Sequence, residues 1–167
     1  VNSKLEELDC HANKIVTLDL TGYTVLTILD CGANQITTLK VNDNKVLSTL
    51  KCGNNKLTTL DLSNNIALKY LECDRNLLAS LDLTKNVGLV NLKCQNNALT
   101  ALNVSQNNIL ESLNCGNNTI TNIDLSHNPQ LSYFSCAYSQ IASLDCSNNP
   151  KLTTLYCYGN KLTTLNI

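Results

Sequence analysis

Nine cysteines are the residues of this 167-residue chain that could do chemistry, as disulfides, metal ligands or reactive thiols. Two of them lie in the stretch YFSCAYSQIASLDC, residues 133 to 146. Zinc sites usually bring two cysteines within two to four residues of each other, and that spacing does not occur here. The cysteines other than Cys146 instead recur at one constant interval, which indicates a repeat architecture: Cys10, Cys31, Cys52, Cys73, Cys94, Cys115, Cys136 and Cys157.

This cysteine ladder is interpreted as a structural feature. Stacked repeats would bring successive cysteines within the Cα distance that a disulfide allows. However, each interior cysteine has two equivalent neighbours, and the total is odd. Free cysteine is also among the most buried residue types. We therefore predict no disulfides, no metal and no cofactor, and thiols that are mostly buried and unreactive, which leaves the redox compartment open.

Other chemistry has few candidates. His11 and His127 fall at different positions of the repeat, so neither a Cys-His nor a Ser-His-Asp arrangement is expected, and the chain is predicted not to be an enzyme. Aspartates two residues before Ser or Thr are interpreted as turn residues: Asp19, Asp61, Asp82, Asp124 and Asp145. Recurrent threonines allow a remote alternative, an ice-binding face, at Thr37, Thr38, Thr58, Thr59, Thr163 and Thr164, but Val16, Ala79, Ala101, Asn122 and Ala142 interrupt their rows.

The repeat unit reads L-x-x-L-x-C-x-x-N-x-[LI]-x-x-L-x-L-[ST]-x-N-x-x, as in LSTLKCGNNKLTTLDLSNNIA from Leu47. It resembles the leucine-rich repeat, L-x-x-L-x-L-x-x-[NC]-x-L. Cysteine at the third leucine, in a 21-residue unit, is similar to the cysteine-ladder subfamily represented by internalin J, a surface adhesin of Listeria. The resemblance covers one domain, residues 1–167, with repeats that start near residues 5, 26, 47, 68, 89, 110, 131 and 152.

Each unit should place one short strand on either side of a thin coil. Leu50 and Cys52 alternate with Thr49 and Lys51, which is typical of a strand with one face inward. Leu60 and Leu62 repeat this pattern in the second half of the unit. We expect a leucine-rich-repeat solenoid of about eight right-handed coils, with a parallel sheet on one side, a second short strand ladder opposite, and little or no α-helix. At about 4.8 Å per coil the rod is roughly 38 Å long.

Two details of the core follow from the same pattern. The asparagines that follow each ladder cysteine by three residues should point inward at the turn, where their amides can bond backbone groups. The seventh coil departs from the others, because Phe134 replaces a core leucine, Ser139 the turn asparagine, and Cys146 a Leu or Val. We expect Phe134 to be accommodated by the smaller Cys146, with Cys136 and Cys146 on facing sheets about 10 Å apart, too far for a disulfide.

Tyrosines supply the candidate binding patch. Four of the six lie in the last two coils, and tyrosine joins a flat apolar ring to a hydrogen-bonding tip, which suits the recognition of proteins and sugars. The alternative, in which the rings only shield the end of the stack, stays open. The candidate residues are Tyr133, Tyr138, Tyr156 and Tyr158, with Tyr70 on the same face.

Composition limits the partners. The net charge of −1 and the short apolar runs argue against nucleic-acid binding and membrane insertion. The resemblance implies a non-catalytic protein- or glycan-binding module of an exported bacterial surface protein, extracellular or at the cell surface, with a host protein or mucin-like glycan as partner. A structural spacer or stalk is the alternative. Because no polar cap is visible, we expect a fragment of a longer surface protein, or end-to-end self-association through edge strands.

Overall fold

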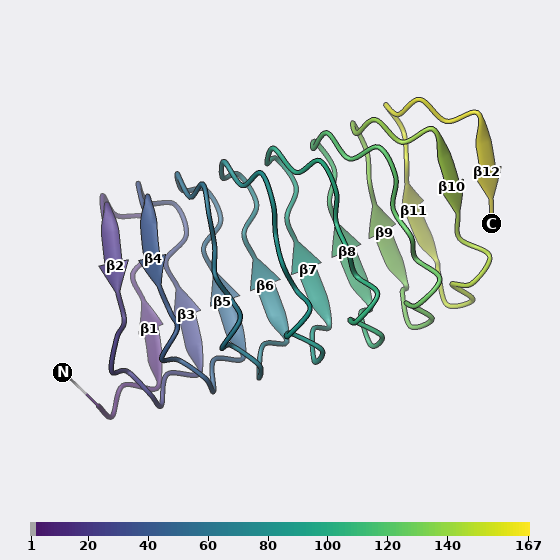
Figure 1. Ribbon diagram of the computed structural model, residues 1–167. Helices are drawn as coiled ribbons and strands as arrows, with labels where there is room; N and C mark the ends of the chain where they lie inside the picture. The colour runs from purple at the N-terminus through teal and green to yellow at the C-terminus, as the bar shows by residue number, and fades with distance from the viewer. Residues whose placement is uncertain (1–2) are drawn as a thin grey trace.

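The computed structural model describes residues 3–167 and is a β-solenoid of eight stacked coils (Figure 1). One side is an eight-stranded parallel sheet, here called the main sheet, which confirms the predicted fold class. No helix of the described chain could cross a membrane. The strands of the main sheet are β1 (Glu7–Asp9), β3 (Ile28–Asp30), β5 (Thr49–Lys51), β6 (Tyr70–Glu72), β7 (Asn91–Lys93), β8 (Ser112–Asn114), β9 (Tyr133–Ser135) and β11 (Thr154–Tyr156).

The register of the main sheet repeats without a slip. Each strand pairs with the equivalent strand of the next coil, so that Leu50 lies between Leu29 and Leu71, and Phe134 lies between Leu113 and Leu155. The backbone N–H of the ladder cysteine extends the pairing, as in the 2.7 Å bond from Cys52 to the carbonyl of Glu72. Because the side-chain period of a strand is two, this register keeps every central leucine inward and its neighbours outward.

The second strand ladder is present at the two ends of the rod. There β2 (Thr17–Asp19) pairs with β4 (Thr38–Lys40), and β10 (Ser143–Asp145) pairs with β12 (Thr164–Asn166), all in parallel (Figure 1). Within residues 41 to 142 the corresponding segments are extended but form no strand pairs, and the described chain has no counterpart there of the 3.0 Å bond from Leu20 N to Lys40 O. Ladder pairing on this side is therefore confined to the terminal coils.

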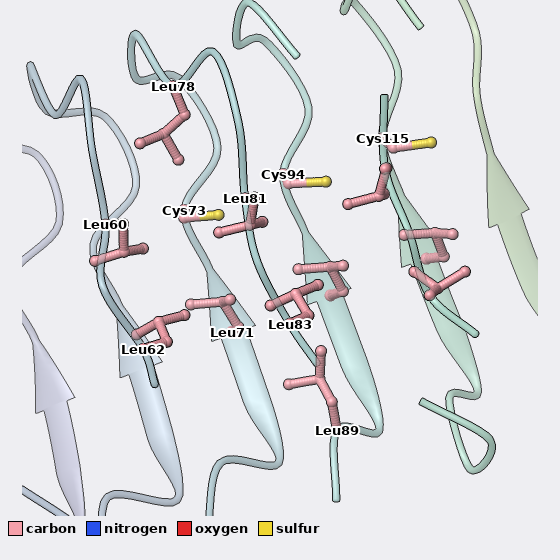
Figure 2. Packing of buried hydrophobic residues seen from close by; sticks show 14 of the residues in the cluster. Leu60, Leu62, Leu71, Cys73, Leu78, Leu81, Leu83, Leu89, Cys94 and Cys115 are labelled. Carbon is pink, nitrogen blue, oxygen red and sulfur yellow. The ribbon is translucent and has the colours of Figure 1, made fainter. Parts of the chain in front are cut away.

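Leucines from both sides of each coil form one continuous core. Leu71 of β6 and Leu62 of the opposite segment lie across from each other, and Cys73, Cys94 and Cys115 form a row beside them (Figure 2). Leu50, Leu71 and Phe134 have no exposed surface. Each fully buried leucine contributes about 1.5 to 3 kcal/mol relative to an exposed one, so repetition of the unit, rather than any single contact, stabilises the rod.

Asparagines tie successive coils together at the turn after the main sheet. The Nδ2 group of Asn76 donates to the carbonyls of Cys52 and Cys73 at 3.0 and 3.1 Å, and its Oδ1 accepts from Leu57 N at 2.9 Å. The same contacts recur along the first asparagine ladder: Asn34, Asn55, Asn76, Asn97, Asn118 and Asn160. Ser139 interrupts this ladder in the seventh coil, and its buried hydroxyl has no partner in the described chain.

A second asparagine ladder fills the turn at the other end of the coil. Asn86, for example, donates from Nδ2 to the carbonyls of Leu62 and Asn65, whereas its buried Oδ1 has no partner among the described residues. The members of this ladder are all buried and share that unpaired oxygen: Asn44, Asn65, Asn86, Asn107, Asn128 and Asn149. Buried polar groups are usually paired, so the first ladder is the better satisfied of the two.

Candidate binding face

The outward side chains of the main sheet form two parallel rows, here called the sheet face. The first residue of each strand gives one row: Glu7, Ile28, Thr49, Tyr70, Asn91, Ser112, Tyr133 and Thr154. The third residue gives the other: Asp9, Asp30, Lys51, Glu72, Lys93, Asn114, Ser135 and Tyr156. Strand pairing alone therefore decides which side chains meet on this face.

Charge is confined to the first five strands of the sheet face. Lys93 Nζ lies 2.8 Å from Glu72 Oε1, and Lys51 Nζ lies 3.5 Å from Asp30 Oδ2, each pair joining neighbouring strands. The outward residues of β8, β9 and β11 carry no charged group. The face is thus divided into an ionic part and an uncharged part that contains tyrosine, hydroxyl and amide groups.

Four tyrosines meet in the uncharged part and form a chain of edge-to-face contacts, here called the tyrosine patch. The ring centroids of Tyr133 and Tyr156 are 5.9 Å apart, those of Tyr156 and Tyr158 are 6.3 Å apart, and those of Tyr138 and Tyr158 are 5.1 Å apart. Such pairs contribute about 0.5 to 1.5 kcal/mol beyond the area they bury. The four rings therefore help to hold one another in place.

Tyr70 is not part of this patch. It occupies the same row as Tyr133, but Asn91 and Ser112 lie between them, so the two rings are three strands apart. Tyr70 is nevertheless as exposed as Tyr156, at 49% against 47%. The structure thus brings together four of the five candidate tyrosines and leaves the fifth isolated.

Tyr138 lies in a turn with left-handed backbone geometry. Each coil has one such residue after its main-sheet strand, and in the seventh coil it is Tyr138, with φ of 56°. A bulky residue is strained there by about 1 to 2 kcal/mol. The next coil has Gly159, with φ of 70°, and a Cβ atom at that glycine would lie 2.5 Å from Tyr138 Cδ1. Non-glycine residues occupy the equivalent turn of the other coils, so Gly159 matters here because it leaves room for the Tyr138 ring.

Solved structures with this architecture identify the type of repeat. InlJ of Listeria monocytogenes, described as including a cysteine ladder, superposes with a TM-score of 0.83 and 40% identity, over 98% of this chain and 42% of InlJ. The chain is a leucine-rich-repeat protein with a cysteine ladder. This leucine-rich-repeat protein thus spans less than half the length of InlJ.

Two more distant leucine-rich-repeat structures show the same fold. InlF of Listeria monocytogenes matches with a TM-score of 0.88 and 22% identity, over 98% of this chain and 54% of InlF. YopM of Yersinia enterocolitica matches with a TM-score of 0.84 and 24% identity, over 100% of this chain and 36% of YopM. Neither a family model nor a curated protein sequence matches the chain.

The thiols of this leucine-rich-repeat protein lie away from the sheet face. All nine are free, and all but Cys10 and Cys157 are buried. Burial raises the pKa of Cys31 and of Cys136 to about 12, and that of Cys146 to about 11. Because the thiolate is the nucleophile and the metal ligand, these cysteines are chemically quiet near neutral pH.

The remaining polar candidates are separated by the fold. His127 lies in a turn beside Ser126, with 3.0 Å between its Nδ1 and the Ser126 Oγ, whereas His11 lies at the sheet face. The Asp-x-Ser/Thr pairs form turns, as the sequence predicts. Asp61 Oδ1 accepts the Ser63 backbone N–H at 3.0 Å, and this bond lowers the pKa of Asp61. Two structural features were not predicted from sequence: the contact between Gly159 and the Tyr138 ring, and the surroundings of His11.

Proposed function

We propose that this chain is a non-catalytic binding module that recognises its partner with the tyrosine patch. The observation that carries the proposal is the linked set of four rings on the uncharged end of the sheet face. Truncation of a central interface tyrosine often costs about 2 kcal/mol or more, so four rings can supply most of the binding energy of a modest interface. Ring faces and phenol groups suit a protein surface or a sugar ring.

Preorganisation supports recognition over simple shielding of the core. Tyr138 is 58% exposed and keeps a strained backbone, although many other residues would fit the same turn with less cost. Tyr158 is equally exposed, at 58%. Rings that served only to cover the core would be expected to lie flat against it. These rings instead stack edge to face, and Tyr138, Tyr156 and Tyr158 stay about half exposed while Tyr133 is partly buried. A rigid aromatic surface loses little conformational entropy when it binds.

The biological setting of the proposal rests on the likeness to InlJ. We place the chain in an exported bacterial surface protein with an adhesin-like role, outside the cell or at its surface, and take a host protein or a mucin-like glycan as the partner. The support is 40% identity and the shared cysteine ladder. A spacer that holds another domain away from the surface is the competing function.

The test is a pair of matched tyrosine variants. Tyr156→Ser removes a ring of the patch, and Tyr70→Ser removes an equally exposed ring outside it. Binding to immobilised mucin and to extracted host surface proteins is measured by surface plasmon resonance. We expect Tyr156→Ser to weaken binding about 30-fold, equivalent to about 2 kcal/mol, and Tyr70→Ser to leave it unchanged. Equal effects of the two variants would contradict a role for the patch.

A second arm separates the partner classes and the spacer function. Enzymatic removal of the glycans from the mucin abolishes binding if the patch recognises sugar, and leaves it intact if the patch recognises protein. Unfolding by urea is recorded for both variants, so that a loss of binding is not confused with a loss of folding. The spacer function is supported if the folded wild-type chain binds none of these surfaces.

A further inference from the structure

A group of metal-ligating side chains lies at the opposite end of the sheet face from the tyrosine patch. One ligand atom from each of Asp9, His11 and Asp30 lies within 4.8 Å of the other two. His11 Nδ1 is 2.6 Å from Asp9 Oδ1. The carboxylates of Asp9 and Asp30 belong to successive coils and meet because the two residues are register partners in β1 and β3.

The charge sequence along the third-residue row points to a cation at this place. The row begins with two acids, Asp9 and Asp30, and continues with Lys51, Glu72 and Lys93. Neighbouring side chains therefore have opposite charges except at one pair, where both are negative. Like charges directly opposite each other in a sheet are destabilising. Asp9 and Asp30 are that pair, and His11 Nδ1 contacts the Asp9 carboxylate within 4.8 Å of an Asp30 oxygen. Lys51 Nζ, 3.5 Å from Asp30 Oδ2, offsets only part of the charge.

We propose that Asp9, His11 and Asp30 form a site for a divalent transition-metal ion of the zinc class. The imidazole favours zinc, nickel or copper, and two carboxylates complete a set of three protein ligands. The ion takes the place of the proton that His11 Nδ1 shares with Asp9 Oδ1. Its positive charge offsets the repulsion between the Asp9 and Asp30 carboxylates. All three side chains are accessible, with Asp30 partly buried, so positions remain open for water or for a donor group of a partner.

Lys51 is the built-in competitor for this ion. Its ammonium group lies 3.5 Å from Asp30 Oδ2 and moves into solvent when the metal binds. Its exposed side chain makes that movement inexpensive, since surface ion pairs contribute little. Removal of the lysine charge should therefore strengthen metal binding, whereas removal of an equal charge at Lys93, which pairs with Glu72, should not.

The test is calorimetric titration of Zn²⁺ in a Cys10→Ser background, since Cys10 is the partly exposed thiol next to the cluster, whereas the adjacent Cys31 is buried. We expect one ion per chain. His11→Ala and Asp30→Asn should weaken binding at least about 10-fold, because loss of even an outer partner of a ligand costs that much. Lys51→Met should strengthen binding about threefold to fivefold. His127→Ala and Lys93→Met are the matched controls and should bind like the parent.

Three results would overturn the site. Equal affinity of the parent and His11→Ala shows that the three side chains form an ion-pair cluster only. A thiolate charge-transfer band on addition of Co²⁺ shows that buried cysteines, opened by partial unfolding, bind the metal. A direct readout comes from the imidazole NMR signals, because Zn²⁺ should shift those of His11 and leave those of His127 in place. Absence of any shift also rejects the proposal.

Discussion

The ring of Tyr138 lies where residue 159 would place its Cβ atom, so any residue other than glycine at position 159 would displace that ring. The distance from that hypothetical Cβ to Tyr138 Cδ1 is 2.5 Å, shorter than van der Waals contact allows. A residue in a turn of the last coil therefore controls the geometry of a ring in the coil before it.

Gly159→Ala is expected to disturb the tyrosine patch and to destabilise the chain by at least about 1 kcal/mol, because alanine is strained at positive φ and displaces the Tyr138 ring. The measurements are urea unfolding and tyrosine fluorescence. Gly88→Ala is the matched control, since its Cβ would lie at an ordinary 3.6 Å from the nearest atom, the Leu68 carbonyl oxygen. Similar losses in both variants would show that the ring contact has no special role.

The two asparagine ladders should differ in their contribution to stability. Asn76→Ala removes the partner of three carbonyls and one N–H, and we expect a loss of about 3 kcal/mol in the free energy of unfolding. Asn86→Ala also removes the partner of two carbonyls, but it deletes a buried side-chain oxygen that has no hydrogen-bond partner in the described chain. We therefore expect a smaller loss in the free energy of unfolding, about 1 to 2 kcal/mol. Chemical denaturation ranks the two variants, and the reverse order would contradict the hydrogen-bond pattern.

Thiol labelling should divide the nine cysteines into two classes. Cys10 and Cys157 are partly exposed and should react with a chromogenic disulfide reagent in the native protein, whereas the other seven should react only after denaturation. Burial raises the pKa of the buried thiols, so their rates should stay low as the pH rises through 8 to about 9. Fewer than nine thiols in unreduced, denatured protein would reveal a disulfide.

It stays a prediction that the small Cys146 side chain makes room in the core for the large Phe134 ring. Both side chains are buried in the same core cluster, with 0% and 4% of their surface exposed. Cys146→Leu should destabilise the chain by about 1 to 3 kcal/mol through overpacking. Val104→Leu is the matched control, because it enlarges the equivalent position of a coil whose main-sheet residue is a leucine. An unchanged or higher melting temperature for Cys146→Leu would contradict the idea.

The main sheet could be predicted because the sequence pattern that produces each strand is local and recurs in every coil. Leu50 and Cys52 alternate with polar residues, and the period of the cysteines sets the register of every strand. The second ladder was predicted along the whole rod because Leu60 and Leu62 show the same alternation. Alternation predicts an extended segment with one buried face, but pairing also needs neighbouring backbones at hydrogen-bonding distance. Only the terminal coils provide that on this side.

The candidate sites were harder to predict, because their residues come together through the stacking of coils. Tyr133, Tyr156 and Tyr158 were placed on one face by the period, but the separation of Tyr70 depends on which residues occupy the intervening strands. The contact of His11 with Asp9 is local, yet Asp30 joins them only through strand pairing. No sequence pattern marked Gly159, because the other coils have Ala, Asn, Arg or Tyr at that turn.

Ser139 gives the rod a preferred place to break under tension. Elsewhere an asparagine amide bridges two coils, as Asn118 does by donating to the Cys94 carbonyl and accepting from Leu99 N. The serine is too short for either contact, so the sixth and seventh coils lack that bridge. A force applied along the stack would therefore separate the last two coils, with their four tyrosines, as a unit. In an optical-trap experiment, Ser139→Asn should raise the force of the first rupture event.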